Sequence, residues 1–178
     1  MEEFKSLEEL TKMDERHWLQ GKVSNAVPDL KKMHEVLSRE RLNEEVPNEI
    51  KGQFNVARNM ALYTYFFYAL APEVQLKTYT IIEFALTLKT DSSKRLRLMD
   101  LLQLAVERSW ISDAAFRHIE SPSVSNEWCK SLQQNMRSLR NSQAHGSPIL
   151  MGDCLLHIQI CADFINQLFP GCSDSGES

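Results

Sequence analysis

The sequence predicts an all-α domain, because three observations favour helices over strands. Apolar residues recur three and four residues apart in several stretches, which is the spacing of one helix face. No stretch alternates apolar and polar residues as a half-buried strand would. Clusters of proline, glycine and serine separate the periodic stretches. We therefore expect a helical bundle joined by short turns.

The composition is that of one globular domain. The chain has 178 residues, 43% of them apolar and 25% charged, which is enough for a core. Its net charge of -4 and pI near 5.8 mean that nucleic-acid binding would need a local basic patch. The four cysteines form no CxxC pair, and the acidic N-terminus does not resemble a secretory signal. These features predict a cytoplasmic protein with reduced thiols.

Residues 1–45 are predicted to form a charged helical extension that packs on the core. A short first helix is marked by three apolar residues, Phe4, Leu7 and Leu10. Pro28 and Asp29 suit the first turn of a second helix, which extends to Leu42. Two histidines of this segment lie among charged residues and are expected at the surface: His17 and His34.

Residues 46–170 are predicted to form the helical bundle, and Pro47 opens its first helix. The later part of this helix, 60–71, is apolar on nearly every side and contains a run of aromatic residues, Tyr63, Tyr65, Phe66, Phe67 and Tyr68. A membrane span needs about 20 apolar residues, so this run is too short to cross a bilayer. We expect it to be the central buried helix.

Pro72 and Glu73 end that helix and start the next, over 74–90, with Glu83 inside an apolar run. A buried unpaired carboxylate is costly, so Glu83 should either pair with an arginine, Arg58 or Arg140, or take up a proton. After a turn at 91–93, a helix over 94–109 is expected. Three cations crowd its first turn, either as an auxiliary anion-binding patch or as a solvated end: Lys94, Arg95 and Arg97.

The hinge at 121–126 leads into a helix that begins near Ser125. Its apolar stripe consists of Trp128, Leu132, Met136 and Leu139. Successive side chains lie about 100° apart on a helix. This places further residues beside the stripe: Arg137, Arg140, Asn141, Ala144 and His145. Gly146 suits the left-handed turn beyond a helix end. A final helix over 149–169 is stopped by Pro170 and Gly171, and residues 171–178 are expected to form a disordered tail.

The side chains beside this stripe suit phosphate chemistry. A histidine of near-neutral pKa can take or give a proton, and a guanidinium can hold a phosphate, as RNA cleavage without a metal requires. The alternative is structural: Arg140 pairs with a carboxylate, and His145 is a cation favoured at a helix C-terminus. Cys154, His157 and Cys161 share one helix face but lack a fourth ligand, so we predict no metal site.

Arg140, Asn141 and His145 resemble the signature of the HEPN superfamily. That signature is an arginine, commonly followed by a polar residue, with a histidine after four to six intervening residues, at the end of the penultimate helix. Four residues separate Arg140 from His145, and Asn141 fills the polar position. The Gly-Ser-Pro turn and the last helix are also similar to those of bacterial members. The resemblance, over about 50–170, implies a bundle of four or five helices with additional N-terminal helices.

The resemblance also implies an activity, a homodimeric endoribonuclease that needs no metal or cofactor. The ribose 2′-hydroxyl attacks the adjacent phosphate and leaves a 2′,3′-cyclic phosphate. His145 would transfer protons, Arg140 would bind the phosphate and Asn141 would orient the imidazole, with Glu83 and Arg137 in support. The alternative is a non-catalytic module that binds a nucleotide or a cognate protein, as in toxin–antitoxin pairs. Neither reading involves a membrane.

Overall fold

Helices account for all the regular secondary structure in the described part of the chain, so the predicted all-α class is confirmed. The computed structural model describes residues 4–18, 29–91, 96–144 and 154–171. The α-helices are α2 (Leu30–Arg39), α3 (Asn48–Tyr63), α4 (Ala71–Thr90), α5 (Leu98–Glu107), α6 (Glu127–Ala144) and α7 (Cys154–Leu168). Short 3-10 helices lie at η1 (Leu7–Glu9), η2 (Tyr68–Leu70) and η3 (Asp113–Ala115).

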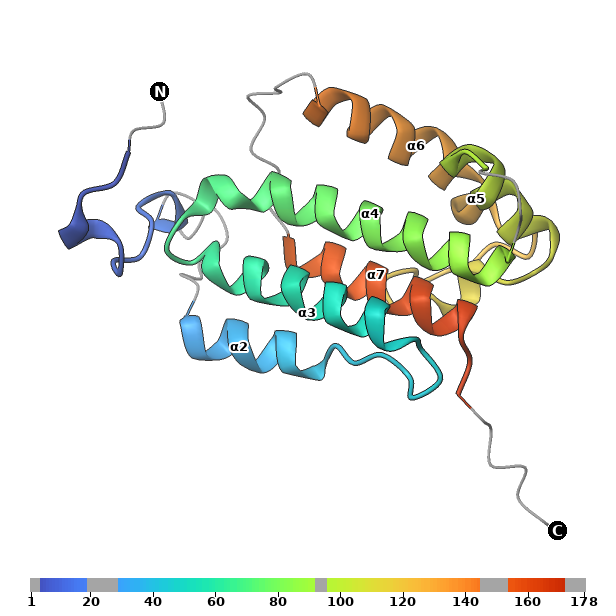
Figure 1. The fold of residues 1–178 in the computed structure, drawn as a ribbon, viewed down its shortest axis with the longest axis horizontal. Helices are drawn as coiled ribbons and strands as arrows, with labels where there is room; N and C mark the ends of the chain where they lie inside the picture. Colours follow the sequence, from blue (N-terminus) through green and yellow to red (C-terminus); the bar gives the residue numbers. More distant parts are fainter. Residues whose placement is uncertain (1–3, 19–28, 92–95, 145–153, 172–178) are drawn as a thin grey trace, which may run out of the picture.

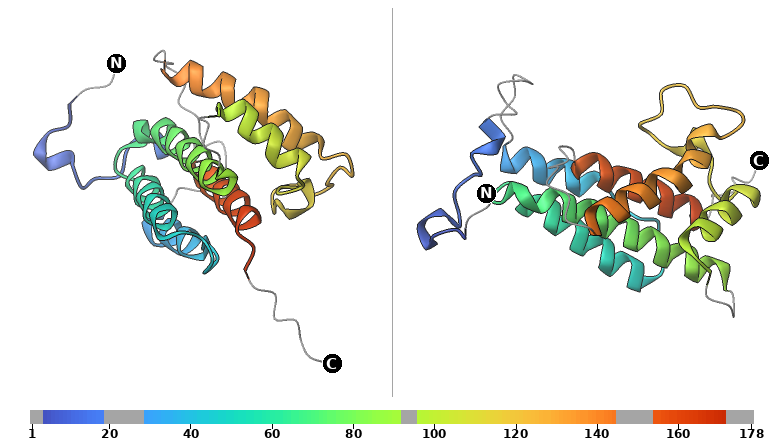
Figure 2. Two further views of the ribbon diagram at one scale, coloured as in Figure 1. Left: turned by 45° about the vertical axis from the view of Figure 1, so that its right-hand side comes forward. Right: turned by 90° about the horizontal axis from the view of Figure 1, so that it is seen from above.

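Helix α4 is the centre of the arrangement. It packs against α3, α5, α6 and α7, while α2 packs against α3 and α7. Figures 1 and 2 show that α3, α4 and α7 run side by side, with α2 on one side of them and α5 and α6 on the other. Helices α2 and α6 therefore lie on opposite sides of this central layer. Among the described residues, no helix is both long enough and apolar enough to cross a membrane.

The core explains why α4 is apolar around most of its circumference. Because neighbours cover it on several sides, α4 buries polar as well as apolar residues, and these polar groups bond to one another. The Gln75 amide donates to the Tyr79 hydroxyl at 2.8 Å, and the Thr78 hydroxyl donates to the Gln75 carbonyl at 2.7 Å. The largest fully buried side chains on the surrounding elements include Phe54, Phe116, Phe164, Ile50 and Met136.

The starts of α2 and α4 lie close to the positions expected from sequence. The Asp29 carboxylate accepts a hydrogen bond from the Lys31 amide at 2.8 Å, so Asp29 is the N-cap of α2. Pro72 lies in the first turn of α4, where its missing N–H leaves no hydrogen bond unmade. Helix α2 ends at Arg39 rather than at Leu42, which lies half-buried in the following loop.

The expected continuous helix over 60–71 is wrong. Helix α3 ends at Tyr63, whose side chain is 60% exposed, and of the five aromatic residues only Tyr68 is buried. The backbone turns because Asp14 binds it from the N-terminal segment. The Asp14 amide donates to the Tyr65 carbonyl at 2.9 Å, and the Tyr68 amide donates to the Asp14 carboxylate at 2.8 Å. A partner about fifty residues away thus replaces helical hydrogen bonds that the local sequence favours.

The N-terminal segment also contradicts two further expectations. His17 is buried rather than solvated: its Nε2 lies 2.9 Å from the Thr64 carbonyl, and its ring contacts those of Tyr65 and Tyr68. The expected first amphipathic helix is only the 3-10 turn η1, too short to present an apolar face. Its three apolar residues are exposed: Phe4, Leu7 and Leu10. The other histidine, His34, is exposed as predicted.

Helix α5 begins later than expected. Helix α5 starts at Leu98, because Arg97 is its N-cap and the Asp100 carboxylate accepts from the Arg97 amide at 3.4 Å. The exposed Arg97 is the described member of the expected cationic patch, and Lys94 and Arg95 lie outside the described residues. Helix α7 is described from Cys154, and residues 145–153 and 172–178 lie outside the described part.

Candidate functional site on helix α6

Helix α6 carries the predicted motif, and a buried carboxylate fixes its first turn. Asp113 accepts hydrogen bonds from the amides of Trp128 at 3.1 Å and Cys129 at 2.9 Å. The Asn126 side chain in turn accepts from the Asp113 amide at 2.9 Å, with Asn126 in the left-handed region at φ 55°. Burial raises the pKa of Asp113, but these N–H donors outweigh it, and the net pKa is lowered. Asp113 is therefore an ionised cap at the positive end of α6.

An apolar stripe holds α6 to the bundle. Cys129, Leu132 and Met136 are buried, and α6 packs against α4 and α5. The half-buried Trp128 ring lies 4.5 Å from the Phe116 ring and 4.7 Å from the His118 ring, measured between centroids. The stripe is confirmed as far as Met136, and the Leu139 side chain lies outside the described part. One side of α6 is thus fixed against the bundle up to the start of the motif.

The motif follows directly along the same helix. The α6 backbone is helical through Ala144, so Arg137 lies about one turn before the adjacent residues Arg140 and Asn141. Their side chains, and the whole of His145, lie outside the described residues. At about 100° per residue, position 140 lies about 40° around the helix from Met136, and positions 137 and 141 lie about 100° and 140° from it. The motif positions therefore extend from the edge of the buried stripe toward the opposite side of α6.

Glu83, the expected acidic neighbour of the motif, lies on α4, which packs against α6. It is half-buried. Arg58, one of its two candidate partners, is bound elsewhere: Nε donates to the Leu37 carbonyl at 2.9 Å, and Nη1 donates to the Asn55 side chain at 3.0 Å. A pairing of Glu83 with Arg140 stays a prediction.

The cysteines and histidine of α7 serve packing in this structure. The Cys154 thiol lies 3.6 Å from the Thr64 hydroxyl, and the Cys161 thiol lies 3.8 Å from the Thr78 carbonyl, to which it donates. Burial raises the pKa of the Cys161 thiol, which keeps it protonated. Within the described ranges, no three histidine, cysteine or acidic side chains are grouped so that they could hold a metal ion.

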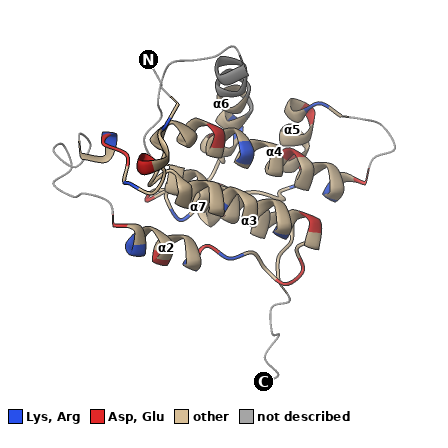
Figure 3. Cartoon of the chain, turned by 60° about the vertical axis from the view of Figure 1, so that its left-hand side comes forward, with Lys and Arg blue, Asp and Glu red and all other residues tan. Residues whose placement is uncertain are grey.

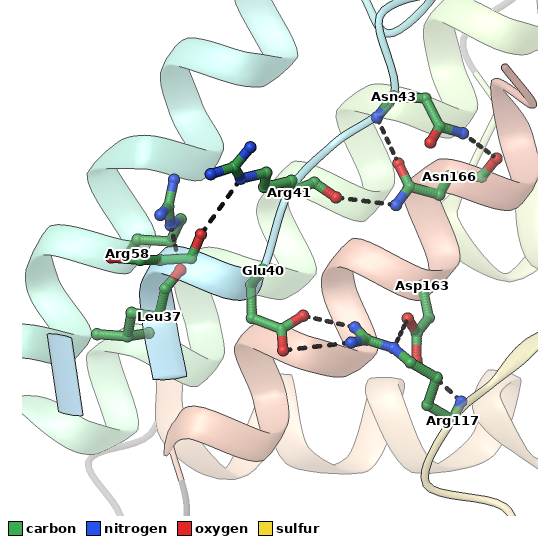
Figure 4. Close-up of polar contacts among 9 residues, drawn as sticks. Leu37, Glu40, Arg41, Asn43, Arg58, Arg117, Asp163 and Asn166 are labelled. Atoms are coloured by element: carbon green, nitrogen blue, oxygen red, sulfur yellow. Dashed lines mark hydrogen bonds and ion pairs between the residues drawn. The ribbon is translucent and has the colours of Figure 1, made fainter. Parts of the chain in front are cut away.

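The structure assembles a buried ion triad that the sequence did not reveal. Arg117 Nη2 lies 2.5 Å from a Glu40 carboxylate oxygen, and Arg117 Nε lies 2.7 Å from an Asp163 oxygen (Figure 4). The hydrogen bond with Glu40, followed by that with Asp163, raises the pKa of Arg117. The triad joins the end of α2, the segment after η3 and α7. Sequence separations of 77 and 46 residues left no local signal for it.

A second polar region that sequence reasoning missed is a groove between α2 and α3. Lys51, Asn55 and Arg58 line it from one face of α3, and Arg41 lines it from the loop after α2. The α3 residues are spaced at i, i+4 and i+7, a signal that could have been found. From sequence, Arg58 was predicted only as a possible partner of Glu83. No spacing pattern in the sequence pointed to Arg41.

Helix α6 is thus fixed at its N-terminal cap and along its buried stripe, with Arg140 and Asn141 on its last turns. No family model, no curated protein and no solved structure matches this chain.

Proposed function

We propose that the protein is a HEPN-like, metal-independent endoribonuclease that acts as a homodimer. One observation carries the proposal: Arg140 and Asn141 lie on the final turns of α6, the last described helix before α7 in an all-α fold. His145 follows immediately in the sequence. The HEPN motif requires this order of residues at this place in the helix order.

The proposed reaction needs only side chains. The 2′-oxygen forms a bond to the adjacent phosphorus while the bond from phosphorus to the 5′-oxygen breaks, which leaves a cyclic phosphate and a 5′-hydroxyl. His145 accepts the proton of the attacking hydroxyl or donates one to the leaving oxygen. Arg140 holds the phosphate and its developing charge, and Asn141 orients the imidazole. Arg137 supplies a second cation, and Glu83 positions Arg140.

A homodimer would complete this site. Positions 140 and 145 differ by five residues, or about 140° around a helix, so a single helix spreads the arginine and the histidine apart. A two-fold axis beside the end of α6 would bring the arginine of one copy toward the histidine of the other. Ala144 has a side chain small enough to permit close approach of the two helices. The pair of histidines would then provide one base and one acid.

RNA cleavage in excess EDTA tests the proposal. The purified protein is compared with His145→Ala and Arg140→Ala, and with Arg39→Ala as a matched control, since Arg39 is exposed on α2 across the central layer. We expect cyclic-phosphate ends from the wild type and the control, and a loss of about 100-fold or more in both motif variants. Circular dichroism checks that each variant is folded. Absence of cleavage, or equal cleavage by all four proteins, rejects the ribonuclease assignment.

The charge distribution favours a second candidate, a non-catalytic module that binds a nucleotide or a cognate protein. The net charge is -4, and Figure 3 shows acidic and basic residues interspersed over the described helices. Such a surface attracts RNA less than a broad basic face does. In this case neither the wild type nor His145→Ala would cleave RNA. Arg140→Ala would weaken binding of the partner.

A further inference from the structure

The groove between α2 and α3 is lined by three cations. Its volume is about 300 Å³, and it is lined by Arg41, Leu42, Lys51, Phe54, Asn55 and Arg58. A second hollow of about 260 Å³ shares Asn55 and Arg58 with it and adds the polar side chains of His34, Ser38 and Asn59. Arg58 therefore lies where the two hollows meet, and the whole concave surface is rich in hydrogen-bond donors.

These cations are bonded to neutral oxygens. Within the described ranges, the ion pairs join Arg16 to Asp14, and Arg117 to both Glu40 and Asp163. The groove cations donate instead to main-chain carbonyls: Arg41 to Ser38 at 3.5 Å, Lys51 to Glu44 at 2.7 Å and Arg58 to Leu37 at 2.9 Å. Carbonyl oxygens carry only partial charge, so the positive charge of the groove is not neutralised by these hydrogen bonds.

The positive charges in the groove repel one another. Burial lowers the pKa of Arg58, the positive charge of Arg41 lowers it further, and Glu40 partly offsets both. The Glu40 carboxylate is itself turned toward Arg117, which takes up its hydrogen-bonding capacity. An anion between Arg41 and Arg58 would convert this repulsion into two attractions.

Hydrogen bonds to main-chain carbonyls orient Arg41 and Arg58. Each uses Nε to bind a carbonyl in the last turn of α2, as Figure 4 shows for Arg58 and Arg41. The Asn166 side chain donates to the Arg41 carbonyl at 3.0 Å, which ties this loop to α7. Among the described residues, both terminal nitrogens of Arg41 and one of Arg58 have no hydrogen-bond partner. The guanidinium of Arg58 is held by two hydrogen bonds and that of Arg41 by one weak bond, so binding a phosphate costs less side-chain freedom than it would for unbonded arginines.

A purely structural role explains less of this arrangement. Arginines that bind the last carbonyls of a helix stabilise its C-terminus, and Arg41 and Arg58 do so for α2. That role uses only Nε of each guanidinium. It does not account for Lys51 on the wall of the same groove.

We propose that the groove of Arg41, Lys51 and Arg58 binds the phosphate group of a small phosphate monoester. The volume of about 300 Å³ is at the lower end of small-molecule sites, which suits a ligand of nucleotide size or less. The elements that line the groove, α3 and the loop after α2, lie on the other side of α4 from α6 (Figure 1). The site is therefore separate from the proposed ribonuclease motif, and neither proposal depends on the other.

Calorimetric titration of the full chain in phosphate-free chloride buffer tests the site. The ligands are inorganic phosphate, adenosine 5′-monophosphate and uncharged adenosine. We expect both phosphates to bind and adenosine not to bind. Arg41→Gln should weaken phosphate binding about tenfold or more, as expected when a charge-assisted bidentate interaction is removed. Arg41 is exposed, so this variant should remain folded. Arg58 is left intact because its guanidinium also lies over the Phe54 ring.

The control variant is Arg97→Gln, which removes the same charge from an exposed position at the start of α5. It should bind phosphate as the wild type does, and so should His145→Ala, whatever the outcome of the ribonuclease assay. Tighter binding of the nucleotide than of inorganic phosphate would identify an ester as the ligand, whereas equal binding would identify the phosphate group alone.

Three results would overturn the proposal. The first is binding of neither phosphate, and the second is equal weakening by Arg41→Gln and Arg97→Gln. The third is binding of an RNA oligonucleotide through Arg41 with no binding of the small phosphates, which would assign the groove to nucleic acid instead.

Discussion

Glu40 and Arg41 are neighbours in the chain, yet they belong to regions in which charged side chains have different kinds of partner. Glu40 is 6% exposed and turns inward to Arg117, whereas Arg41 is exposed and turns toward the groove (Figure 4). In the inner region, two carboxylates share one guanidinium. In the groove, each of the three cations donates to a carbonyl or amide oxygen of its own. Buried carboxylates are paired with a cation, whereas the cations of the groove are bonded only to neutral oxygens.

Charged side chains that stabilise the fold thus differ from those that are available to bind a ligand. Carboxylates that are mostly buried must be satisfied by the protein, because they have little contact with water. Asp113 follows this rule with amide donors, and Glu40 and Asp163 follow it with Arg117. Groove cations keep much of their hydration, so the fold tolerates their mutual repulsion. Each of the following predictions tests one side of this distinction.

Loss of Arg117 should have the largest effect on stability. Arg117→Met would leave Glu40 and Asp163 buried without their cation, and breaking a buried pair in this way costs about 3–5 kcal/mol. The Arg117 side chain is 52% exposed, which lets water reach the site, so we expect a smaller loss of about 2–3 kcal/mol. Urea unfolding measures the loss. Arg39→Met, which removes an exposed arginine one residue before Glu40, is the control and should change stability by less than about 0.5 kcal/mol. Equal effects would show that the triad does not stabilise the fold.

Acidification should destabilise the protein in two steps. Burial lowers the pKa of His118, whose Nδ1 has no hydrogen-bond partner among the described residues. A histidine with a lowered folded-state pKa takes up its proton more readily when unfolded, so stability falls as the pH drops below about 6.5. Burial raises the pKa values of Asp14 and Asp113, but hydrogen bonds from Arg16 to Asp14 and from amides to Asp113 outweigh it. Their lowered pKa values stabilise the fold above about pH 4, and this contribution is lost at lower pH.

Urea unfolding between pH 8 and pH 3 would resolve both steps. His118→Phe keeps a ring beside Trp128 and should remove the upper step while leaving the lower one. A free energy of unfolding that rises on acidification below about pH 6.5, or an upper step that survives in His118→Phe, would contradict the assignment.

The cap of α6 should contribute less than the triad. Asp113→Asn keeps one acceptor for the amides of Trp128 and Cys129 but removes the negative charge at the helix N-terminus. We expect a loss of about 1 kcal/mol at pH 7, the usual size of an N-cap contribution. The loss should shrink as the pH approaches 3, because the unfolded wild-type chain then takes up a proton at Asp113 and the contribution of the folded-state carboxylate falls. Chemical unfolding at both pH values checks this, and a loss that is independent of pH would mean that the charge of Asp113 contributes nothing.

Local patterns were sufficient to predict the helices, and long-range interactions explain where these predictions fail. The stripe of Leu132 and Met136 and the cap at Asp29 depend on residues a few positions apart, and the structure confirms both. The end of α3 depends on Asp14, and the burial of His17 depends on Thr64. Neither partner lies in the sequence window that a periodicity argument examines.

The candidate sites differ in the same way. The α6 motif was found because its residues lie within one stretch of six positions, and its assembly with His145 stays a prediction. The groove combines α3 with a loop residue, Arg41, whose position depends on Asn166 of α7. Spacing along α3 could have pointed to Lys51 and Arg58, but only the folded chain brings Arg41 to them.

Charge reversal at Arg41 should have the smallest effect and an unusual sign. In low-salt buffer without phosphate, Arg41→Glu removes repulsion with Arg58 and adds an attraction, so we expect stability to rise by about 0.5 kcal/mol. The substitution also removes the hydrogen bond from Arg41 Nε to the Ser38 carbonyl, which is weak because it is 3.5 Å long. Arg39→Glu is the matched control. It reverses an equally exposed arginine in the last turn of α2, where a cation is favourable, and should lower stability by a few tenths of a kcal/mol.

Thermal unfolding of these two variants, with and without phosphate, therefore distinguishes a ligand site from a helix cap. Added salt should reduce the gain in Arg41→Glu by screening the charges. Phosphate should raise the Tm of the wild type and of Arg39→Glu but not of Arg41→Glu, because a ligand stabilises only the folded protein that binds it. If Arg41→Glu is instead destabilised as much as Arg39→Glu, the cation at position 41 stabilises the end of α2 and the groove carries no excess charge for a ligand to neutralise.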